Sequence, residues 1–541
     1  MYDKAYKNKV GINMRINNLV KYIFIAFAIG IIIYAGYRIY KNNNTEKNEV
    51  EVVESKEEII KDIRLAICNY DTINPLITNN KEILNIDTLI FEPLFSISSD
   101  YQLEPCLATE WSRTGDKTYV IKLETSIKWQ DGTHISAKDV QFTIDRLKEG
   151  NSVYKSNVSH VISVEVIDDA TVKIILDEEV PFFEYNLTFP ILSNSFYSTE
   201  DFYNPSKMLI GTGRFKITDV SSTSITLEKN KDWKNISKYD SKIESIKVNI
   251  YSTMGEVFNS FKLGNVDLIN TTIQNYQDYI GTIGFNVIES PGREFDFISL
   301  NCEDKIFQSQ GVRQAIGFAI DKDNIISSVY ANQKIMSTYP LDYGNYVYEN
   351  NNNSSGYNAE QAKKTLEDDG WEYTNNRWSK RIDGVNTTLR IRLSVNKENS
   401  QRVQVAEIIK EQLENIGIPV TIVNLSNSQY QSALEQKDYQ MLITGVYNSY
   451  SPNLTYFFGE NNISNYRNEN ILSILSSGIS TKSSKVLKEK YSEIYNTYKA
   501  EVPFIGLYRS KNITITSEKL IGEIIVNNYS TFYNISNWYR K

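Results

Sequence analysis

The chain has 541 residues, 41% hydrophobic and 23% charged, a composition typical of a globular protein too long for a single ordinary core. A net charge of −8 offers no basic surface for phosphates and excludes a nucleic-acid-binding protein. Three cysteines allow at most one disulfide, so free buried thiols are expected, and two histidines argue against a His-based metal or acid/base site.

The charge is unevenly distributed along the chain. The first 41 residues carry seven lysines and arginines against one acid, a net charge of +6, so the remaining 500 residues carry −14. Within this basic end, Tyr22 to Tyr37 reads YIFIAFAIGIIIYAGY and contains no charge. Flanking apolar residues and snorkelling cations extend it, which predicts a transmembrane helix over residues 19–40.

Cations dominate before this segment, so the positive-inside rule places the basic N-terminus, residues 1–18, in the cytoplasm. The body is then extracytoplasmic, in a single-pass protein of the cell membrane. Residues 41–61 are polar and mostly acidic and are predicted to form a flexible stalk. A cleaved signal peptide is the alternative, although no convincing small-x-small cleavage site is present.

The body is predicted to begin with a short strand, Ile63 to Ile67. Two motifs follow, Asp71-x-x-Asn74-Pro75-Leu76 and Phe91-Glu92-Pro93-Leu94, and the proline of each fixes a turn. Between them, Thr78 to Glu82 is predicted to be a loop.

A distinctive stretch runs from Leu107 to Leu147. After LATEW, the residues Thr118 to Leu123 alternate apolar and polar, as a half-buried strand requires. WQDGT then predicts an Asp-Gly turn. Ser136 can cap a helix whose third residue is Asp139, which places Val140, Ile144 and Leu147 on one stripe.

The pattern continues with alternating strands and helices. Residues 161–176 predict a hairpin turning at Asp168-Asp169, and Arg293 to Asn301 predicts a strand. A helix carries Val312, Ile316 and Ile320 on one face. Asn358 is predicted to cap a helix that ends at Gly370, and Ser400 to precede a helix that stops at Gly417. The strands 420–423 and 439–446 follow, so this part of the chain is α/β.

The order of these elements resembles the solute-binding proteins of the oligopeptide/dipeptide/nickel family, family 5, which are receptors of ABC importers. The aromatic-x-Asp-Gly turn before a Ser-Ala-x-Asp-Val helix start carries most of the resemblance, with Gln130 in place of a small residue. Gly211-Thr212-Gly213 and the turn from Phe261 to Asp267 also match. Gram-positive members usually carry a lipidated cysteine after the signal segment. None lies there, so the helix 19–40 would serve as the tether.

The resemblance implies an α/β, two-lobed fold of the periplasmic-binding-protein type II, with an extra third domain. By analogy, lobe I combines residues 62–91, 206–292 and 505–541. Residues 92–205 would form the extra domain II, and 293–504 lobe II. A ligand would bind at the cleft between the lobes, and closure would be a hinge motion.

Catalytic signatures are missing from the sequence. It contains no Gly-x-Ser-x-Gly, His-Glu-x-x-His or Cys-x-x-Cys motif, so no enzyme, cofactor or metal site is expected. A glycoside hydrolase built on two distant carboxylates stays open from sequence alone, because such a pair meets only in the tertiary structure.

The predicted ligand contacts lie in three places. Peptide receptors of the family typically carry an Asp-Tyr-x-x-Pro sequence near Tyr450, and the resemblance implies that this Asp holds the peptide α-ammonium group. Here Ser449 occupies that position, which weakens such a contact because a carboxylate adds charge assistance. The residues expected to contact a ligand are Asn79, Asn80, Asn301, Tyr447, Asn448, Ser449 and Tyr450.

Three functions remain open on this basis. The first is a membrane-anchored monomer that captures oligopeptides and delivers them to ABC permease subunits. The second is a receptor of the same fold for a non-peptide ligand, such as a chelated metal, a sugar or a signal molecule. The third is a sensing or surface protein without a transporter.

Overall fold

The structure is a computed structural model that describes residues 29–36, 38, 59–239, 241–271, 274–349, 356–478, 481 and 483–541. The chain divides into two units, Met1–Ile59 and Ile60–Lys541. In the first unit residues 29–36 and 38 are helical. The rest of the predicted span 19–40, the N-terminus 1–18 and most of the stalk 41–61 lie outside the described residues. In the part of the chain that is described, no helix has both the length and the apolar character needed to cross a bilayer.

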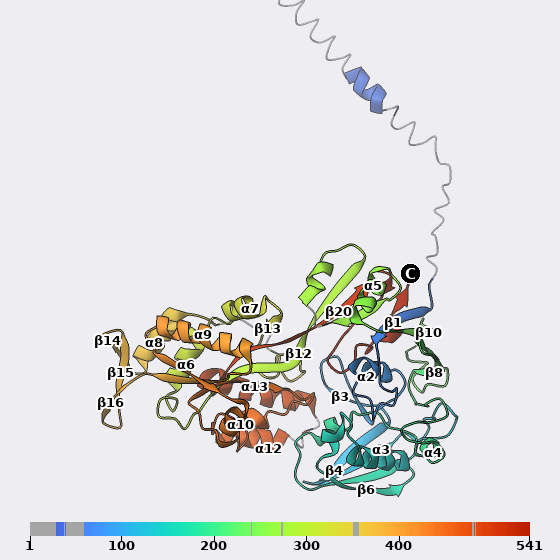
Figure 1. The fold of residues 1–541 in the computed structure, drawn as a ribbon, viewed down its shortest axis with the longest axis horizontal. Helices are drawn as coiled ribbons and strands as arrows, with labels where there is room; N and C mark the ends of the chain where they lie inside the picture. The colour runs from blue at the N-terminus through green and yellow to red at the C-terminus, as the bar shows by residue number, and fades with distance from the viewer. Residues whose placement is uncertain are drawn as a thin grey trace, which may run out of the picture. The chain divides into compact units, whose positions relative to one another are not determined.

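The second unit begins with a four-stranded sheet in the order β1-β10-β9-β8 (Figure 1). β1 (Asp62–Cys68) runs parallel to β10 (Ser245–Tyr251), while β9 (Ser224–Lys229) is antiparallel to both β10 and β8 (Phe215–Val220). The strand predicted at Ile63–Ile67 is confirmed. Ile63, Leu65 and Ile67 are buried on one face of β1, as period-two alternation requires.

Helix α2 (Lys81–Asp87) follows β1. Asn80 caps it, because the Asn80 side chain accepts hydrogen bonds from the backbone N–H groups of Glu82 and Ile83. The loop predicted from Thr78 to Glu82 is therefore shorter than expected, since its last two residues are helical.

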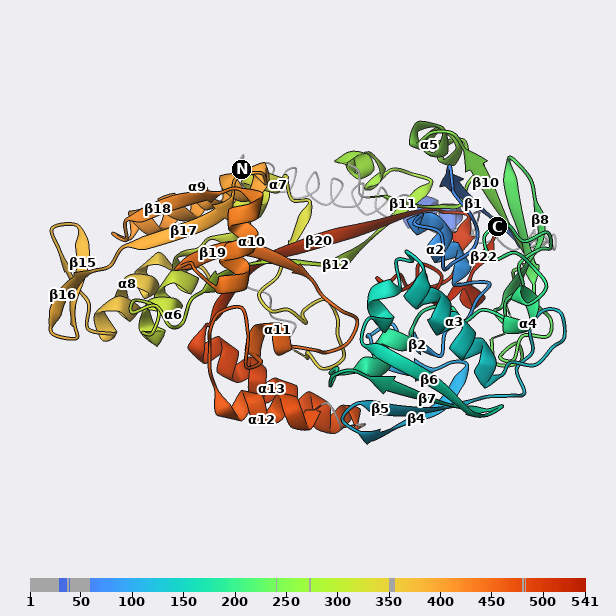
Figure 2. The same ribbon diagram turned by 60° about the horizontal axis from the view of Figure 1, so that its bottom comes forward.

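A second four-stranded sheet has the order β4-β5-β7-β6 and carries α3 (Ala137–Glu149) against β6 and β7 (Figure 2). The predicted strand Thr118–Leu123 is β5, and the predicted hairpin 161–176 is present. The predicted capping box of α3 is also present, formed by Ser136 and Asp139. The remaining strands of the sheet are β4 (Ala108–Gly115), β6 (Val161–Asp168) and β7 (Thr171–Leu176).

Two long antiparallel strands, β12 (Phe285–Leu300) and β20 (Phe504–Ser517), run side by side through this unit (Figures 1 and 2). They belong to a seven-stranded sheet in the order β11-β20-β12-β19-β17-β18, with β13 also paired to β20. The strand predicted to begin at Arg293 already begins at Phe285. The other strands of this sheet are β11 (Leu268–Thr271), β13 (Lys334–Met336), β17 (Ile391–Asn396), β18 (Val420–Leu425) and β19 (Met441–Tyr447).

Helices pack around the β17–β19 end of that sheet. Asn358 caps α8 as predicted, but α9 is capped by Asn399, whose side chain accepts a hydrogen bond from the Arg402 N–H at 3.0 Å. Ser400 is therefore the first residue of α9 rather than the residue before it. The helices between β12 and β20 in the chain are α6 (Gln310–Ala319), α7 (Lys322–Tyr330), α8 (Ala359–Asp368), α9 (Ser400–Asn415), α10 (Asn427–Gln436), α11 (Thr455–Phe458), α12 (Glu469–Gly478) and α13 (Ser484–Glu501).

Shorter elements complete the described fold. They include α4 (Asn194–Tyr197) and α5 (Met254–Lys262), the latter packed on β1 and β10. The remaining strands form small sheets: β2 (Phe95–Ile97) with β3 (Leu103–Pro105), β14 (Glu372–Thr374) with β15 (Arg377–Ile382) and β16 (Val385–Thr388), and β21 (Leu520–Ile521) with β22 (Tyr539–Arg540).

The buried apolar side chains form several clusters. One joins the first two sheets, and another surrounds the helices packed on β17 and β18. A third is rich in aromatic residues and brings Ile97, Tyr101 and Phe182 together with Phe295 and Tyr343. This third cluster therefore connects residues early in the chain with the crossing strand β12. The predicted division into lobe I, domain II and lobe II stays a prediction.

Candidate functional site

The pairing of β12 with β20, which we call the crossing strands, is irregular around Gly292 of β12. The register between β12 and β20 shifts between Pro291 and Phe295. A Cβ atom on Gly292 would lie 2.1 Å from the Ser510 Oγ, so this close approach of the strands requires glycine. Such an irregularity bends a strand and changes the direction of neighbouring side chains. Arg293 is the next residue.

A buried ion pair lies beside this irregularity. The Arg509 guanidinium donates from Nε (2.9 Å) and Nη2 (2.5 Å) to the Asp342 carboxylate, and each side chain is only 1% exposed. The same guanidinium donates to the carbonyls of Gly292, Tyr339 and Pro340 at 3.0–3.2 Å. The charge of Arg509 is thus offset, and its donor groups are occupied.

Arg293 lies in a different environment. Its Cζ is 4.4 Å from the ring centroid of Tyr447 and 3.8 Å from that of Tyr450, which are cation–π distances. Its Nε donates to the Asn448 carbonyl at 2.6 Å. No carboxylate of the described residues forms an ion pair with it.

Tyrosines from distant parts of the chain gather around Tyr450. The ring of Tyr101, in the turn between β2 and β3, is 6.3 Å from that of Tyr450 and 4.7 Å from that of Tyr343. Tyr529 meets Tyr450 edge-on at 5.5 Å, and the Tyr450 hydroxyl donates to the Asn528 carbonyl at 2.8 Å. The segment after β19 is therefore fixed against both the β2–β3 turn and the C-terminal segment.

Burial controls the ionisation of these phenols. Desolvation raises the pKa of Tyr450 above its ordinary value, although the nearby Arg293 charge acts in the opposite direction. Burial raises the pKa of Tyr101 in the same way. Both phenols are consequently neutral at physiological pH and do not offset the charge of Arg293.

The structure brings four of the predicted contact residues together, because Tyr447 ends β19 and Asn448, Ser449 and Tyr450 follow it. The Tyr447 side chain is 65% exposed. The Ser449 side chain is exposed and interacts with the Ser451 hydroxyl at 2.7 Å. Asn448 is buried, and its amide donates to the Pro340 carbonyl. In this run, Tyr447 and Ser449 are the residues most open to solvent.

The other three predicted residues lie elsewhere and have local roles. The Asn79 N–H donates to Asp71 at 3.1 Å, and Asn80 caps α2. The Asn301 amide donates to the carbonyls of Lys437 and Tyr439 at the end of β12. Among the described residues, no hydrogen bond joins these three side chains to the run 447–450. Their contact with a ligand stays a prediction.

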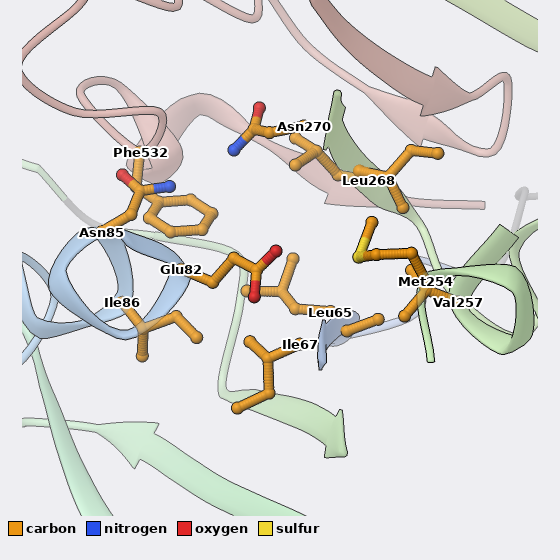
Figure 3. Close-up of a pocket in the computed structure, with 12 residues that line it drawn as sticks. Leu65, Ile67, Glu82, Asn85, Ile86, Met254, Val257, Leu268, Asn270 and Phe532 are labelled. Carbon is orange, nitrogen blue, oxygen red and sulfur yellow. The ribbon is translucent and has the colours of Figure 1, made fainter. Parts of the chain in front are cut away.

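A small cavity lies between β1, α2, α5 and β11 (Figure 3). Apolar side chains line most of it, and the Glu82 carboxylate points toward its centre. Burial raises the pKa of Glu82, while a hydrogen bond from the Cys68 N–H lowers it. The cavity volume of about 40 Å³ accommodates no more than about three water molecules, so it is too small for a peptide.

The described part of the chain contains His, Cys, Asp and Glu side chains, the residue types that commonly bind metal ions. No cluster of three or more His, Cys, Asp or Glu residues with metal-ligand geometry occurs in that part of the chain. The cysteines Cys68, Cys106 and Cys302 are free and partly buried. Burial raises the pKa of the Cys106 thiol well above its ordinary value, so this thiol is not poised to act as a nucleophile.

Sequence reasoning predicted Tyr447 and Tyr450 but missed the arginine and the other tyrosines around them, a region that we call the crossing-strand junction. Arg293 was read only as the first residue of a strand, and Tyr101, Tyr343 and Tyr529 carried no local signal. The adjacent pair Gly292-Arg293 was a usable hint, since a glycine inside a strand often marks an irregularity or a close backbone approach.

Comparisons with known proteins agree with this architecture. Residues 102–465 match the family model of bacterial extracellular solute-binding proteins, family 5. The oligopeptide-binding protein AppA of Bacillus subtilis is 24% identical over 86% of this chain and 89% of its own length. The glutathione-binding protein GsiB of Pectobacterium atrosepticum is 23% identical over 85% of this chain and 91% of its own.

A solved structure shows the same fold. The unliganded open form of the periplasmic murein tripeptide-binding protein MppA superposes with a TM-score of 0.75, at 16% identity, over 89% of this chain and 97% of its own. The family model covers well over half of the sequence. The chain therefore belongs to the bacterial extracellular solute-binding proteins of family 5, which are extracytoplasmic receptors of ABC importers and not enzymes.

Proposed function

We propose that this receptor captures oligopeptides between its two lobes and delivers them to an ABC permease. The observation that carries the proposal is the match along most of the chain to a relative named as an oligopeptide-binding protein. The relative named as glutathione-binding also has a short peptide as its ligand.

The crossing-strand junction supports the proposal. A peptide is held through main-chain hydrogen bonds and side-chain surface, which require exposed polar groups beside apolar ones. Tyr447 and Ser449 supply an exposed ring and an exposed hydroxyl at the point where β19 meets β12. In this proposal β12 and β20 form the hinge, and closure around the peptide produces the state that the permease recognises.

We propose in addition that the N-terminal segment anchors the receptor to the cell membrane. The uncharged run from Tyr22 to Tyr37 supports this, together with the excess of cations before it. Sequencing of the mature N-terminus tests the anchor. A terminus beyond Tyr37 would show that the segment is removed.

Native mass spectrometry of the full chain, purified in detergent from a bacterial host, tests peptide capture. The expected result is a distribution of co-purified peptide masses that disappears after unfolding and refolding. Added peptides should then raise the melting temperature, because a ligand that binds only the folded state stabilises it. A single non-peptidic mass, or no thermal response to a broad peptide mixture, would refute the proposal.

A further inference from the structure

The charge of Arg293 has no counterpart among the described residues. Its neighbour Arg509 faces Asp342, whereas the Arg293 guanidinium donates to one backbone carbonyl, lies against two tyrosine rings and interacts with the Tyr450 hydroxyl. Tyr101 and Tyr343 lie within the fields of both arginines, and burial raises the pKa of each phenol. Asp342 therefore offsets the charge of Arg509, while no carboxylate of the described residues pairs with Arg293.

The contacts of the Arg293 guanidinium with the described residues include no ionised group and one backbone acceptor. Nε donates to the Asn448 carbonyl, which fixes the plane of the group, and the rings of Tyr447 and Tyr450 hold it by cation–π contact. Arg293 is partly exposed and Tyr447 is 65% exposed, so solvent reaches this place. A guanidinium held in one plane presents parallel N–H donors that match the two oxygens of a carboxylate.

The neighbouring predicted contact residue is uncharged. Ser449 is exposed, and its hydroxyl interacts with Ser451 rather than with an ionised group. A positive centre without a nearby acid attracts an anion and repels an ammonium group. The same residues would therefore favour one end of a peptide over the other.

We propose that Arg293 binds a carboxylate of the captured ligand, with Tyr447 and Tyr450 holding the guanidinium in position. The proposal rests on peptide capture as the function and specifies the chemistry that is recognised. The carboxylate belongs either to the C-terminus of the peptide or to an acidic side chain. In both cases it forms a two-point, charge-assisted contact with the guanidinium.

The test uses three pools of tri- to octapeptides, and the full chain in detergent. The first pool has neutral side chains and free C-termini, the second has the same sequences as C-terminal amides, and the third is amidated but carries one glutamate. Affinities are measured by competition calorimetry for the native chain and for Arg293→Gln. The matched control is Arg467→Gln, which removes a surface arginine whose side chain is 77% exposed.

The native chain should bind the first or the third pool about 10- to 100-fold more tightly than the second, as expected for hydrogen bonds to a charged group. Preference for the first pool identifies the C-terminal carboxylate, and preference for the third an acidic side chain. Arg293→Gln should abolish the preference, so that the variant binds the three pools with equal affinity. Arg293→Lys should restore part of it, because the charge returns without the planar fork. Arg467→Gln should behave like the native chain.

Two results would overturn these ideas separately. Equal binding of all three pools by the native chain refutes the role of Arg293 and leaves peptide capture intact. No binding of any pool refutes peptide capture itself. The comparison of pools on the native chain does not depend on how well a variant folds.

Discussion

The buried pair Arg509–Asp342 gives the most direct test of how the crossing strands are held. Asp342→Asn keeps the size of the side chain but removes the negative charge that faces Arg509, and both side chains are 1% exposed. It also places an amide where Asp342 accepts hydrogen bonds from the N–H groups of Thr338 and Tyr339. A buried charge left without its partner costs about 3–5 kcal/mol in the free energy of unfolding.

That cost translates into a measurable shift in melting temperature. The unit Ile60–Lys541 has roughly 480 residues, for which the unfolding entropy is roughly 1 kcal/mol per kelvin. Asp342→Asn should therefore lower the melting temperature by about 3–5 °C in scanning calorimetry. The control Glu360→Gln breaks an ion pair whose carboxylate is 83% exposed, and it should change the melting temperature by less than about 1 °C.

A double-mutant cycle separates the pair from its surroundings. Arg509→Met together with Asp342→Asn should cost less than the sum of the two single changes, because no charge is left alone in the interior. Additive costs, or a loss below about 1 kcal/mol for Asp342→Asn alone, would refute the reasoning.

Three further predictions address separate places in the fold. Gly292→Ala should destabilise the protein by about 1–3 kcal/mol and weaken peptide binding in calorimetry, because the new Cβ would lie 2.1 Å from the Ser510 Oγ; unchanged binding and stability would contradict this. Asn80→Ala should lower the unfolding free energy by about 1 kcal/mol through loss of the α2 cap, and a change in peptide affinity at unchanged stability would instead indicate a ligand contact. Asp87 is buried, without a hydrogen-bond partner for its carboxylate among the described residues, and desolvation raises its pKa. Above about pH 4 the carboxyl ionises in the unfolded chain while burial keeps it protonated in the fold, so Asp87 lowers the stability increasingly as the pH rises. The melting-temperature gain from Asp87→Asn should therefore grow between about pH 4 and pH 8. Parallel melting curves for the two proteins would exclude that role.

Local patterns in the sequence were sufficient to predict many of the helices and strands. The alternation from Thr118 to Leu123 determined β5, because period-two burial belongs to a half-buried strand. Ser136 and Asp139 determined the start of α3, since both halves of the capping box lie within four residues. The same stretch also carried the resemblance to the family.

Elements that depend on distant partners were predicted less well. The start of β12 at Phe285 was missed because Pro291 and Gly292 interrupt the alternation, and the strand exists there through its pairing with β20. Asn80 is predicted as a ligand contact, which stays a prediction, and in the structure its side chain caps α2. An asparagine before a helix and an asparagine facing a ligand have the same sequence signal, so sequence alone did not distinguish them.

The sequence by itself determined the family and the α/β class and indicated the run Tyr447–Tyr450 as a candidate ligand-contact region, because each of these follows from contiguous residues. The tertiary structure alone placed Arg293 over Tyr447 and Tyr450, with a hydrogen bond to Asn448 that spans 155 positions. It also paired Arg509 with Asp342 across 167 positions. An arginine is paired with a carboxylate or left unpaired according to which residues the folded chain brings near it. No local sequence pattern shows which residues those are.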